Sequence, residues 1–215
     1  MRYTSALFDL DGTLLDTLAD LTAAMNRTLT RHGLPERTRQ QMRAALGNGA
    51  RRLMELSVPA GTDSALFETL LTEYNADYAA HCRIETAPYP GVAALLRTLH
   101  AQGRKLAIVS NKPDEAVRAM RADFFADSVP IAVGETAAIR RKPAPDMLLA
   151  AMEQLGADPA GTVFVGDSEV DIATARAADL PCISVLWGFR DRDVLERAGA
   201  QQFAADAGEL ARLLD

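Results

Sequence analysis

Residues 6–13 read Ala-Leu-Phe-Asp-Leu-Asp-Gly-Thr, and this stretch decides how the rest of the chain is interpreted. Its apolar start predicts a buried strand, and two carboxylates, Asp9 and Asp11, follow where that strand ends. Side chains two positions apart in an extended segment point to the same face, so these carboxylates can converge. Close like charges need a cation or a shared proton. A capped strand–turn junction uses the same residue types, so the remaining sequence has to decide between the two interpretations.

Gly12 adds a second feature to this motif. A glycine after the carboxylates allows a tight turn, and the backbone N–H groups of such a turn can approach an anion. Paired oxygen ligands, one of them a candidate nucleophile, beside an anion-accepting turn indicate Mg²⁺-assisted phosphoryl transfer.

Composition and charge narrow the class of protein. The chain has 215 residues, of which 48% are hydrophobic and 24% charged, as in ordinary globular proteins. The net charge of −6 and the lack of a basic stripe argue against nucleic-acid binding. The length fits one domain with an insertion or two small domains.

The expected compartment follows from three sequence features. Cys82 and Cys182 are too few for a disulfide framework or a zinc site. The aspartate motif begins within ten residues of the start, which leaves no room for a signal peptide, and no apolar run approaches a membrane span. We expect a cytoplasmic protein that does not bind membranes.

Short apolar segments alternate with helical patterns over most of the chain. Continuous apolar runs are typical of a parallel sheet covered on both faces, so the alternation predicts a doubly wound, mostly parallel α/β sheet. Helical patterns at 92–102 and 147–155 and a terminal helix at 206–215 separate or follow the strands. The predicted strands are residues 5–8, 105–109, 131–133, 162–165, 182–186 and 202–204.

Residues 16–87 interrupt this alternation. They contain four helical patterns, at 18–32, 39–46, 50–56 and 63–78, with Gly and Pro at their ends. We therefore predict an α/β core formed by residues 1–15 and 88–215, with an all-helical cap at 16–87 inserted after the first strand.

Further polar residues follow predicted strands of the core. Ser110 and Asn111 come directly after the strand at 105–109, before a proline suited to the first turn of a helix. Asp167 follows the strand at 162–165, and Asp171 lies one helical turn later, on the same side. Ligands collect at the carboxyl ends of strands in open α/β sheets, so these motifs are expected to meet. Each motif alone also has a purely structural explanation. Ser110 or Asn111 would serve as a helix cap, and Asp167 and Asp171 would be stabilised by the dipole at the start of a helix.

The use of lysine is a second clue. The chain has three lysines, Lys105, Lys112 and Lys142, against twenty arginines. A compact ammonium such as that of Lys142 can lie between a phosphoryl oxygen and a carboxylate. The loop around Lys142 is also basic enough to be simply solvated.

Taken in order, these motifs resemble those of the haloacid dehalogenase superfamily of aspartate-nucleophile phosphatases. The likeness rests on residues 9–13, Ser110, Lys142, Asp167 and Asp171, and it extends over nearly the whole chain, helical cap included. Within the superfamily, residues 47–50, 81–82, 89–92, 110–113 and 166–169 are most similar to the phosphoglycolate phosphatase group.

The resemblance implies a role for each motif residue. Asp9 attacks phosphorus and forms an aspartyl-phosphate, and Asp11 protonates the leaving group and then activates water. Asp9, Asp11 through its backbone carbonyl, Asp167 and Asp171 hold or support Mg²⁺. Ser110 and the amides of Gly12 and Asn111 bind phosphoryl oxygens, and Lys142 offsets their charge.

Selectivity for the leaving group is expected to come from the cap. Arg51 follows a glycine-flanked break and could meet a small carboxylate, although a solvated arginine fits the same pattern. The implied partner is a small phosphorylated metabolite, with 2-phosphoglycolate the first choice, and the chain is expected to be a monomer or homodimer.

Three other functions within the superfamily are compared by sequence. A dehalogenase does not need the acid at Asp11. A phosphonatase needs a cap lysine, and residues 16–87 contain none. A phosphomutase of the β-phosphoglucomutase type would also be expected to have a cap lysine, but this excludes it less firmly, and it stays open. A catalytically silent phosphate-binding protein of the same fold is the alternative outside enzymes.

Overall fold

The computed structural model describes residues 2–215 and separates into two compact units. The core unit consists of Met1–Leu15 and Pro88–Asp215, and the helical unit consists of Asp16–Ala87. Each unit has its own buried side chains and is described by itself below.

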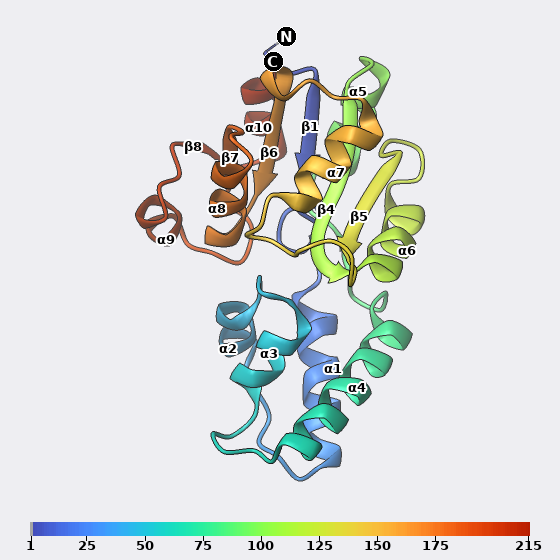
Figure 1. The fold of residues 1–215 in the computed structure, drawn as a ribbon, viewed down its shortest axis with the longest axis vertical. Coiled ribbons are helices and arrows are strands. Elements are labelled where there is room, and N and C mark those ends of the chain that lie inside the picture. Colours follow the sequence, from blue (N-terminus) through green and yellow to red (C-terminus); the bar gives the residue numbers. More distant parts are fainter. Residues whose placement is uncertain (1) are drawn as a thin grey trace. The chain divides into compact units, whose positions relative to one another are not determined.

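The core unit is built on a six-stranded sheet in which every neighbouring pair is parallel (Figure 1). β1 lies between β4 and β6, and all four of its residues are buried. A strand in that position is hydrogen-bonded on both edges, which explains why its sequence is continuously apolar. The order across the sheet is β5 (Ile131–Glu135), β4 (Lys105–Pro113), β1 (Ser5–Phe8), β6 (Thr162–Gly166), β7 (Cys182–Val185) and β8 (Gln202–Ala204).

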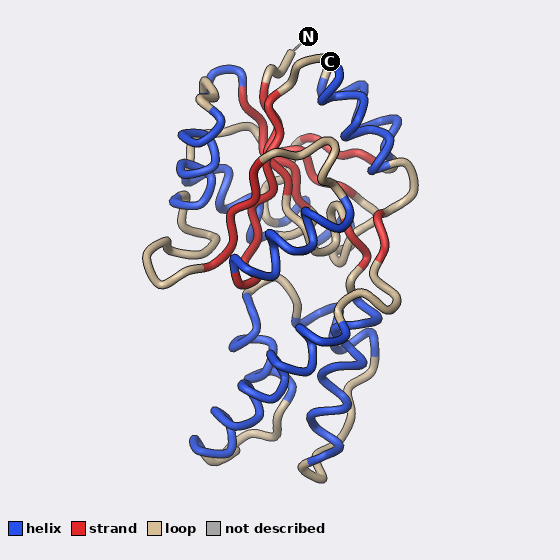
Figure 2. The backbone as a smooth tube through the Cα atoms, turned by 90° about the vertical axis from the view of Figure 1, so that its right-hand side faces the viewer, coloured by secondary structure: helices blue, strands red, loops and turns tan. Residues whose placement is uncertain are grey.

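Helices lie on both sides of this sheet (Figure 2). α7 and α8 pack against inward side chains of the central strands, including Leu7, Val109 and Phe164, in one buried cluster. The helices are α5 (Val92–Ala101), α6 (Asp114–Phe124), α7 (Asp146–Leu155), α8 (Glu169–Ala177), α9 (Arg192–Arg197) and α10 (Ala207–Leu214), with a 3₁₀ turn η1 at Pro159–Gly161. The predicted fold class, a doubly wound parallel α/β sheet with a helical insertion, is confirmed.

Two details of the core unit differ from the prediction. β4 continues through Ser110 to Pro113, because the chain shifts register after Val109 and pairs again at Pro113 with Glu135. The six-residue helix α9 has one buried residue, Leu195, and so lacks the apolar periodicity that would have revealed it.

The helical unit contains α1 (Leu18–Arg31), α2 (Arg39–Ala45), α3 (Gly49–Ser57) and α4 (Ser64–His81). All four predicted helices are present, with ends shifted by at most three residues. Thr38 starts α2 with a reciprocal capping box, and the Asp63 carboxylate caps α4. These side chains satisfy backbone N–H groups that a helix start otherwise leaves unpaired.

One buried carboxylate fastens the end of the helical unit to its beginning. Asp20, on α1, is 3% exposed and accepts hydrogen bonds from the backbone N–H groups of Ile84, Glu85 and Thr86 and from the Thr86 hydroxyl, at 2.8–3.1 Å. Two-residue strands β2 (Leu15–Asp16) and β3 (Ala87–Pro88), which were not predicted, pair with each other where the chain leaves and re-enters the core unit.

Candidate active site

The site is formed where three adjacent strands of the core unit end. Phe8, the last residue of β1, is paired with Ile108 of β4 and with Val165 of β6. Because the strands are parallel, the residues that follow them reach the same edge of the sheet. Asp9, the 110–112 segment and Asp167 are brought together in this way.

Asp9 is held by two donors. Its Oδ1 accepts the N–H of Leu10 at 2.7 Å and lies 2.8 Å from the Nζ of Lys142. The residue is 8% exposed, so its carboxylate is largely withdrawn from water but is not sealed off. A fixed carboxylate at an accessible strand end has the placement that a nucleophile requires.

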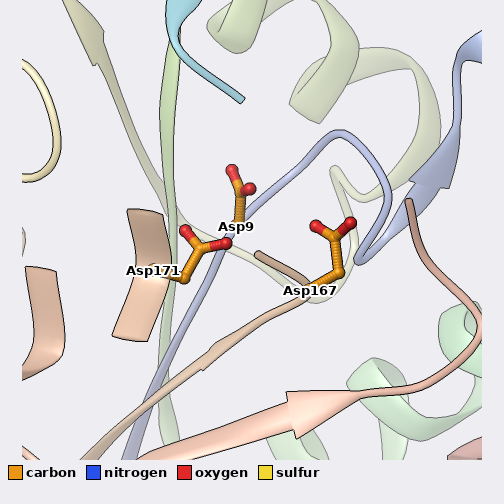
Figure 3. A group of neighbouring side chains, drawn as sticks. All are labelled: Asp9, Asp167 and Asp171. Atoms are coloured by element: carbon orange, nitrogen blue, oxygen red, sulfur yellow. The ribbon is translucent and has the colours of Figure 1, made fainter. Parts of the chain in front are cut away.

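Asp9, Asp167 and Asp171 form a buried cluster of carboxylates. Each offers an oxygen atom, and the three atoms lie within 4.8 Å of one another. Figure 3 shows the three side chains entering the same region from separate segments of the chain. Asp171 has no exposed surface and is the third residue of α8, where its Oδ2 accepts from both the backbone N–H and the hydroxyl of Ser168.

Burial and mutual repulsion make this cluster electrostatically costly. Burial, followed by the charge of Asp171, raises the pKa of Asp9 well above its ordinary range. The same causes raise the pKa of Asp167 to about 7. Both shifts mean that the nearby positive charge is too small to stabilise the ionised carboxylates fully. A bound cation would supply the missing positive charge.

Lys142 supplies part of that charge. Its side chain is 2% exposed, and its Nζ lies 2.8 Å from Asp9 Oδ1 and 2.7 Å from Asp171 Oδ1. Burial lowers the pKa of Lys142, but the charges of Asp171 and Asp9 outweigh it and hold the pKa above its usual range. The ammonium therefore remains charged.

The backbone of Lys142 is also fixed. The Asn111 side chain accepts the N–H of Lys142 at 2.8 Å and donates to its carbonyl at 3.0 Å. This reciprocal pair joins the end of β4 to the loop before α7. Asn111 thus positions Lys142, while the predicted contact of its own amide with phosphate stays a prediction.

Several groups hold Asp167 from the other side. Thr13 Oγ1 donates to one carboxylate oxygen at 3.2 Å, and the N–H of Phe189 donates to the other at 2.7 Å. A Cβ at Gly12 would lie 2.4 Å from an Asp167 oxygen, and one at Gly188 would lie 2.3 Å from the Asp167 Cβ. Both positions therefore have to be glycine.

The second carboxylate of the motif, Asp11, points to a different partner. Its Oδ1 lies 3.0 Å from the Nζ of Lys112, at the end of β4. Among the described residues, the three-carboxylate cluster consists of Asp9, Asp167 and Asp171, so the Asp11 carboxylate stands outside it. Its predicted metal contact, through the backbone carbonyl, stays a prediction.

Other predicted site residues have clear local contacts. The N–H of Gly12 donates to the Leu15 carbonyl at 2.9 Å, and Ser110, 2% exposed, accepts the N–H of Lys112 at 3.3 Å. Arg51, in the helical unit, forms two hydrogen bonds to Glu68, both at 2.8 Å. The phosphate and leaving-group contacts assigned to these residues stay predictions.

A divalent ion fits the carboxylate cluster. The donors are hard oxygen atoms from three carboxylates, the ligand type that Mg²⁺ selects, and the raised pKa values of Asp9 and Asp167 show that added positive charge is favoured there.

The sequence predicts no role for Lys112, and for residues 187–190, which follow a predicted strand, it leaves open a segment that lines the site or a packed loop. The indole N–H of Trp187 donates to the Thr13 carbonyl at 3.0 Å, next to the contacts of Gly188 and Phe189 with Asp167. Their signal was position: residues 187–189 follow β7, the strand beside β6, and Lys112 is one of three lysines in an arginine-rich chain.

Comparison with known proteins agrees with this geometry. The family model for haloacid dehalogenase-like hydrolases matches residues 6–185. A phosphoglycolate phosphatase of Xanthomonas campestris pv. campestris (strain 8004) is 35% identical over 192 residues, which cover 88% of this chain and 86% of that protein. An N-acetylmuramic acid 6-phosphate phosphatase of Pseudomonas aeruginosa is 34% identical over 217 residues, covering 100% and 96%.

A solved structure from Lactobacillus delbrueckii subsp. bulgaricus, provisionally named a phosphoglycolate phosphatase, is also similar. Its TM-score is 0.94 at 36% identity, and the match covers 100% of this chain and 99% of that one. The family match spans most of the chain, and the aspartate cluster lies at the strand ends of the matched core, so the chain belongs to the haloacid dehalogenase-like hydrolase family. Within that family it is a phosphatase that resembles the phosphoglycolate phosphatases.

Within residues 2–215, no helix combines the length and the apolar character needed to cross a bilayer.

Proposed function

We propose that this chain is a Mg²⁺-dependent phosphomonoester hydrolase that works through an aspartyl-phosphate formed on Asp9. The observation that supports this most is the separation of the two motif carboxylates. Asp9 belongs to the buried cluster and contacts Lys142, whereas Asp11 contacts Lys112 outside it. A nucleophile and an acid–base group need such different surroundings.

The reaction takes place in two displacements. In the first, an oxygen of Asp9 bonds to phosphorus while the bond from phosphorus to the ester oxygen breaks, and Asp11 donates its proton to that departing oxygen. In the second, water attacks phosphorus, Asp11 takes a proton from the water, and the bond to Asp9 breaks to release phosphate. Positioning and charge stabilisation supply most of the catalysis in phosphoryl transfer.

The surrounding residues support these steps. Lys142 neutralises part of the charge beside Asp9, which permits an anionic phosphate to approach a carboxylate. Asp9 and Asp167, with Asp171 directly or indirectly, would hold Mg²⁺, which polarises phosphoryl oxygens and neutralises charge when bound. Ser110 and the amides near Gly12 and Asn111 are the proposed phosphate donors.

The proposed substrate class is a small phosphorylated metabolite that carries a carboxylate. 2-Phosphoglycolate is the first candidate, because several relatives near 35% identity are named phosphoglycolate phosphatases. N-acetylmuramic acid 6-phosphate is the second, because the relative named for it aligns with the full length of this chain. Arg51 is the proposed contact for the carboxylate. We propose no nucleic-acid or membrane partner, a cytoplasmic location, and a monomer or homodimer.

Hydrolysis assays with purified protein test the proposal. Phosphate release from 2-phosphoglycolate, N-acetylmuramic acid 6-phosphate, glucose phosphates and a nucleoside monophosphate would be measured with Mg²⁺ and with excess chelator. We expect Mg²⁺-dependent release that Asp9→Asn abolishes. Turnover that persists in chelator, or equal activity of the Asp9→Asn protein, would overturn the mechanism, and interconversion of sugar phosphates without phosphate release would indicate a mutase.

A further inference from the structure

The unassigned lysine of the site, Lys112, contacts the carboxylate to which proton transfer is assigned. Its Nζ lies 3.0 Å from Asp11 Oδ1, and its side chain is 7% exposed, against 20% for that of Asp11. The pair therefore joins a buried cation to a carboxylate at the edge of the site. An ion pair with one buried partner is screened less by solvent than a surface pair.

Packing restricts the Lys112 side chain, which is 7% exposed. Lys112 belongs to β4, and its N–H donates to the hydroxyl of Ser110, 3.3 Å away. Asp11 lies in the turn after β1, where it forms an isolated backbone bridge with Leu15. Because the Lys112 side chain is more deeply buried than that of Asp11, its ammonium has less room to move and can direct the carboxylate.

The distribution of lysines sets this contact apart from the arginine pairs elsewhere. Two of the three lysines lie at the site, Lys142 beside Asp9 and Asp171, and Lys112 beside Asp11. Each of the two motif carboxylates thus has its own ammonium group. With a divalent ion bound, its charge and those of the two ammonium groups would together balance the four carboxylates of the site, which are Asp9, Asp11, Asp167 and Asp171.

We propose that Lys112 is a positioning residue for Asp11: it holds the Asp11 carboxylate where a proton can pass to the leaving oxygen of the substrate. This inference rests on the proposed function. Lys112 acts through Asp11 and not on the phosphate, so its effect depends on how much the leaving group needs a proton. An alkyl ester has a strongly basic leaving oxygen, whereas the anion released from 4-nitrophenyl phosphate leaves without protonation.

The experiment is a double-mutant cycle on two substrates. The four proteins are wild type, Lys112→Met, Asp11→Asn and the double variant, and kcat/KM is measured on 2-phosphoglycolate, or on the best alkyl phosphate of the panel, and on 4-nitrophenyl phosphate. This parameter reports the first displacement, in which Asp11 acts as the acid. We expect Lys112→Met to lower kcat/KM by about 10²-fold on the alkyl ester, the cost of a misplaced catalytic group, and much less on the aryl ester.

The cycle identifies how Lys112 acts. If it works through Asp11, Lys112→Met has no further effect in the Asp11→Asn background. Additive losses on the alkyl ester would overturn the inference, as would equal losses on both esters. Weaker competitive inhibition by inorganic phosphate in Lys112→Met would also overturn it, because that would make the lysine a phosphate ligand.

Two further variants complete the design. Lys105→Met changes the lysine at the opposite end of the same strand and should leave both kcat/KM values unchanged. Lys112→Arg keeps the charge, and partial recovery on the alkyl ester is expected; it also provides the measurement if the methionine variant does not fold. Failure of the proposed function would appear separately, as Asp9→Asn retaining activity, whereas an additive cycle in an enzyme that depends on Asp9 removes only the role of Lys112.

Discussion

Lys142→Met should strongly destabilise the metal-free protein. Methionine keeps most of the side-chain volume, so the change removes the ammonium and its contacts with Asp9 and Asp171 while the Asn111 hydrogen bonds to the backbone remain possible. The variant leaves three buried carboxylates within 4.8 Å without their neighbouring cation. Removal of one partner from a buried ion pair costs about 3–5 kcal/mol.

That loss is a large part of the whole stability of a typical domain, about 5–15 kcal/mol. The assay is urea unfolding followed by circular dichroism near neutral pH in excess chelator, with wild type and Lys105→Met as references. Lys105 is exposed, so its variant should stay within about 0.5 kcal/mol of wild type. Saturating Mg²⁺ should reduce the loss in Lys142→Met, because the ion supplies positive charge to the same carboxylates.

A stability of Lys142→Met within about 1 kcal/mol of wild type in chelator would refute this reasoning. It would mean that the carboxylates are solvated or protonated at no cost, and that the buried cluster does not carry the charge assigned to it.

The remaining predictions concern pH, a glycine and the helical unit. Burial raises the pKa of Asp167 to about 7, above its value in the unfolded chain, so the folded protein binds this proton more tightly. The stability that the proton contributes is present at low pH and is lost as pH rises. The urea concentration at the unfolding midpoint of the chelated protein should therefore decrease as pH rises from about 5 to about 8, and a flat profile would contradict this. Gly188→Ala places a Cβ 2.4 Å from the Gly12 carbonyl and should weaken Mg²⁺ activation by about 10–100-fold in a metal titration, with an unchanged titration as the contrary result. Asp20→Ala removes the acceptor of the 84–86 amides, should cost about 3 kcal/mol and should speed their hydrogen exchange; unchanged exchange would show that other groups hold this segment.

Much of the fold follows from local sequence. The β1 and β6 segments are fully buried, and β4 is buried between its two exposed ends, so their apolar runs could be predicted as strands in the right order. Asp9 and Asp167 could be placed together for the same reason, because the carboxyl ends of neighbouring parallel strands share an edge.

The contacts that were missed depend on tertiary structure. No local pattern shows that the N–H of Phe189 meets Asp167, since the two lie 22 residues apart and meet through the turn after β7. The Asn111 pair with Lys142 likewise joins segments 31 residues apart. The sequence indicates a role for the backbone amide of Asn111, and its side-chain geometry reveals in addition that it fixes the loop around Lys142.

The shortage of lysine leaves this protein with an unusual chemical handle. Two of its three side-chain amines are buried against carboxylates, whereas Lys105 is exposed at the amino end of β4, roughly 20 Å of strand away from Lys112. Amine-directed dyes, tethers or resins should therefore attach chiefly through Lys105 among the side chains. The protein could thus be anchored to a surface with its reaction centre left untouched, with no need to engineer an attachment point.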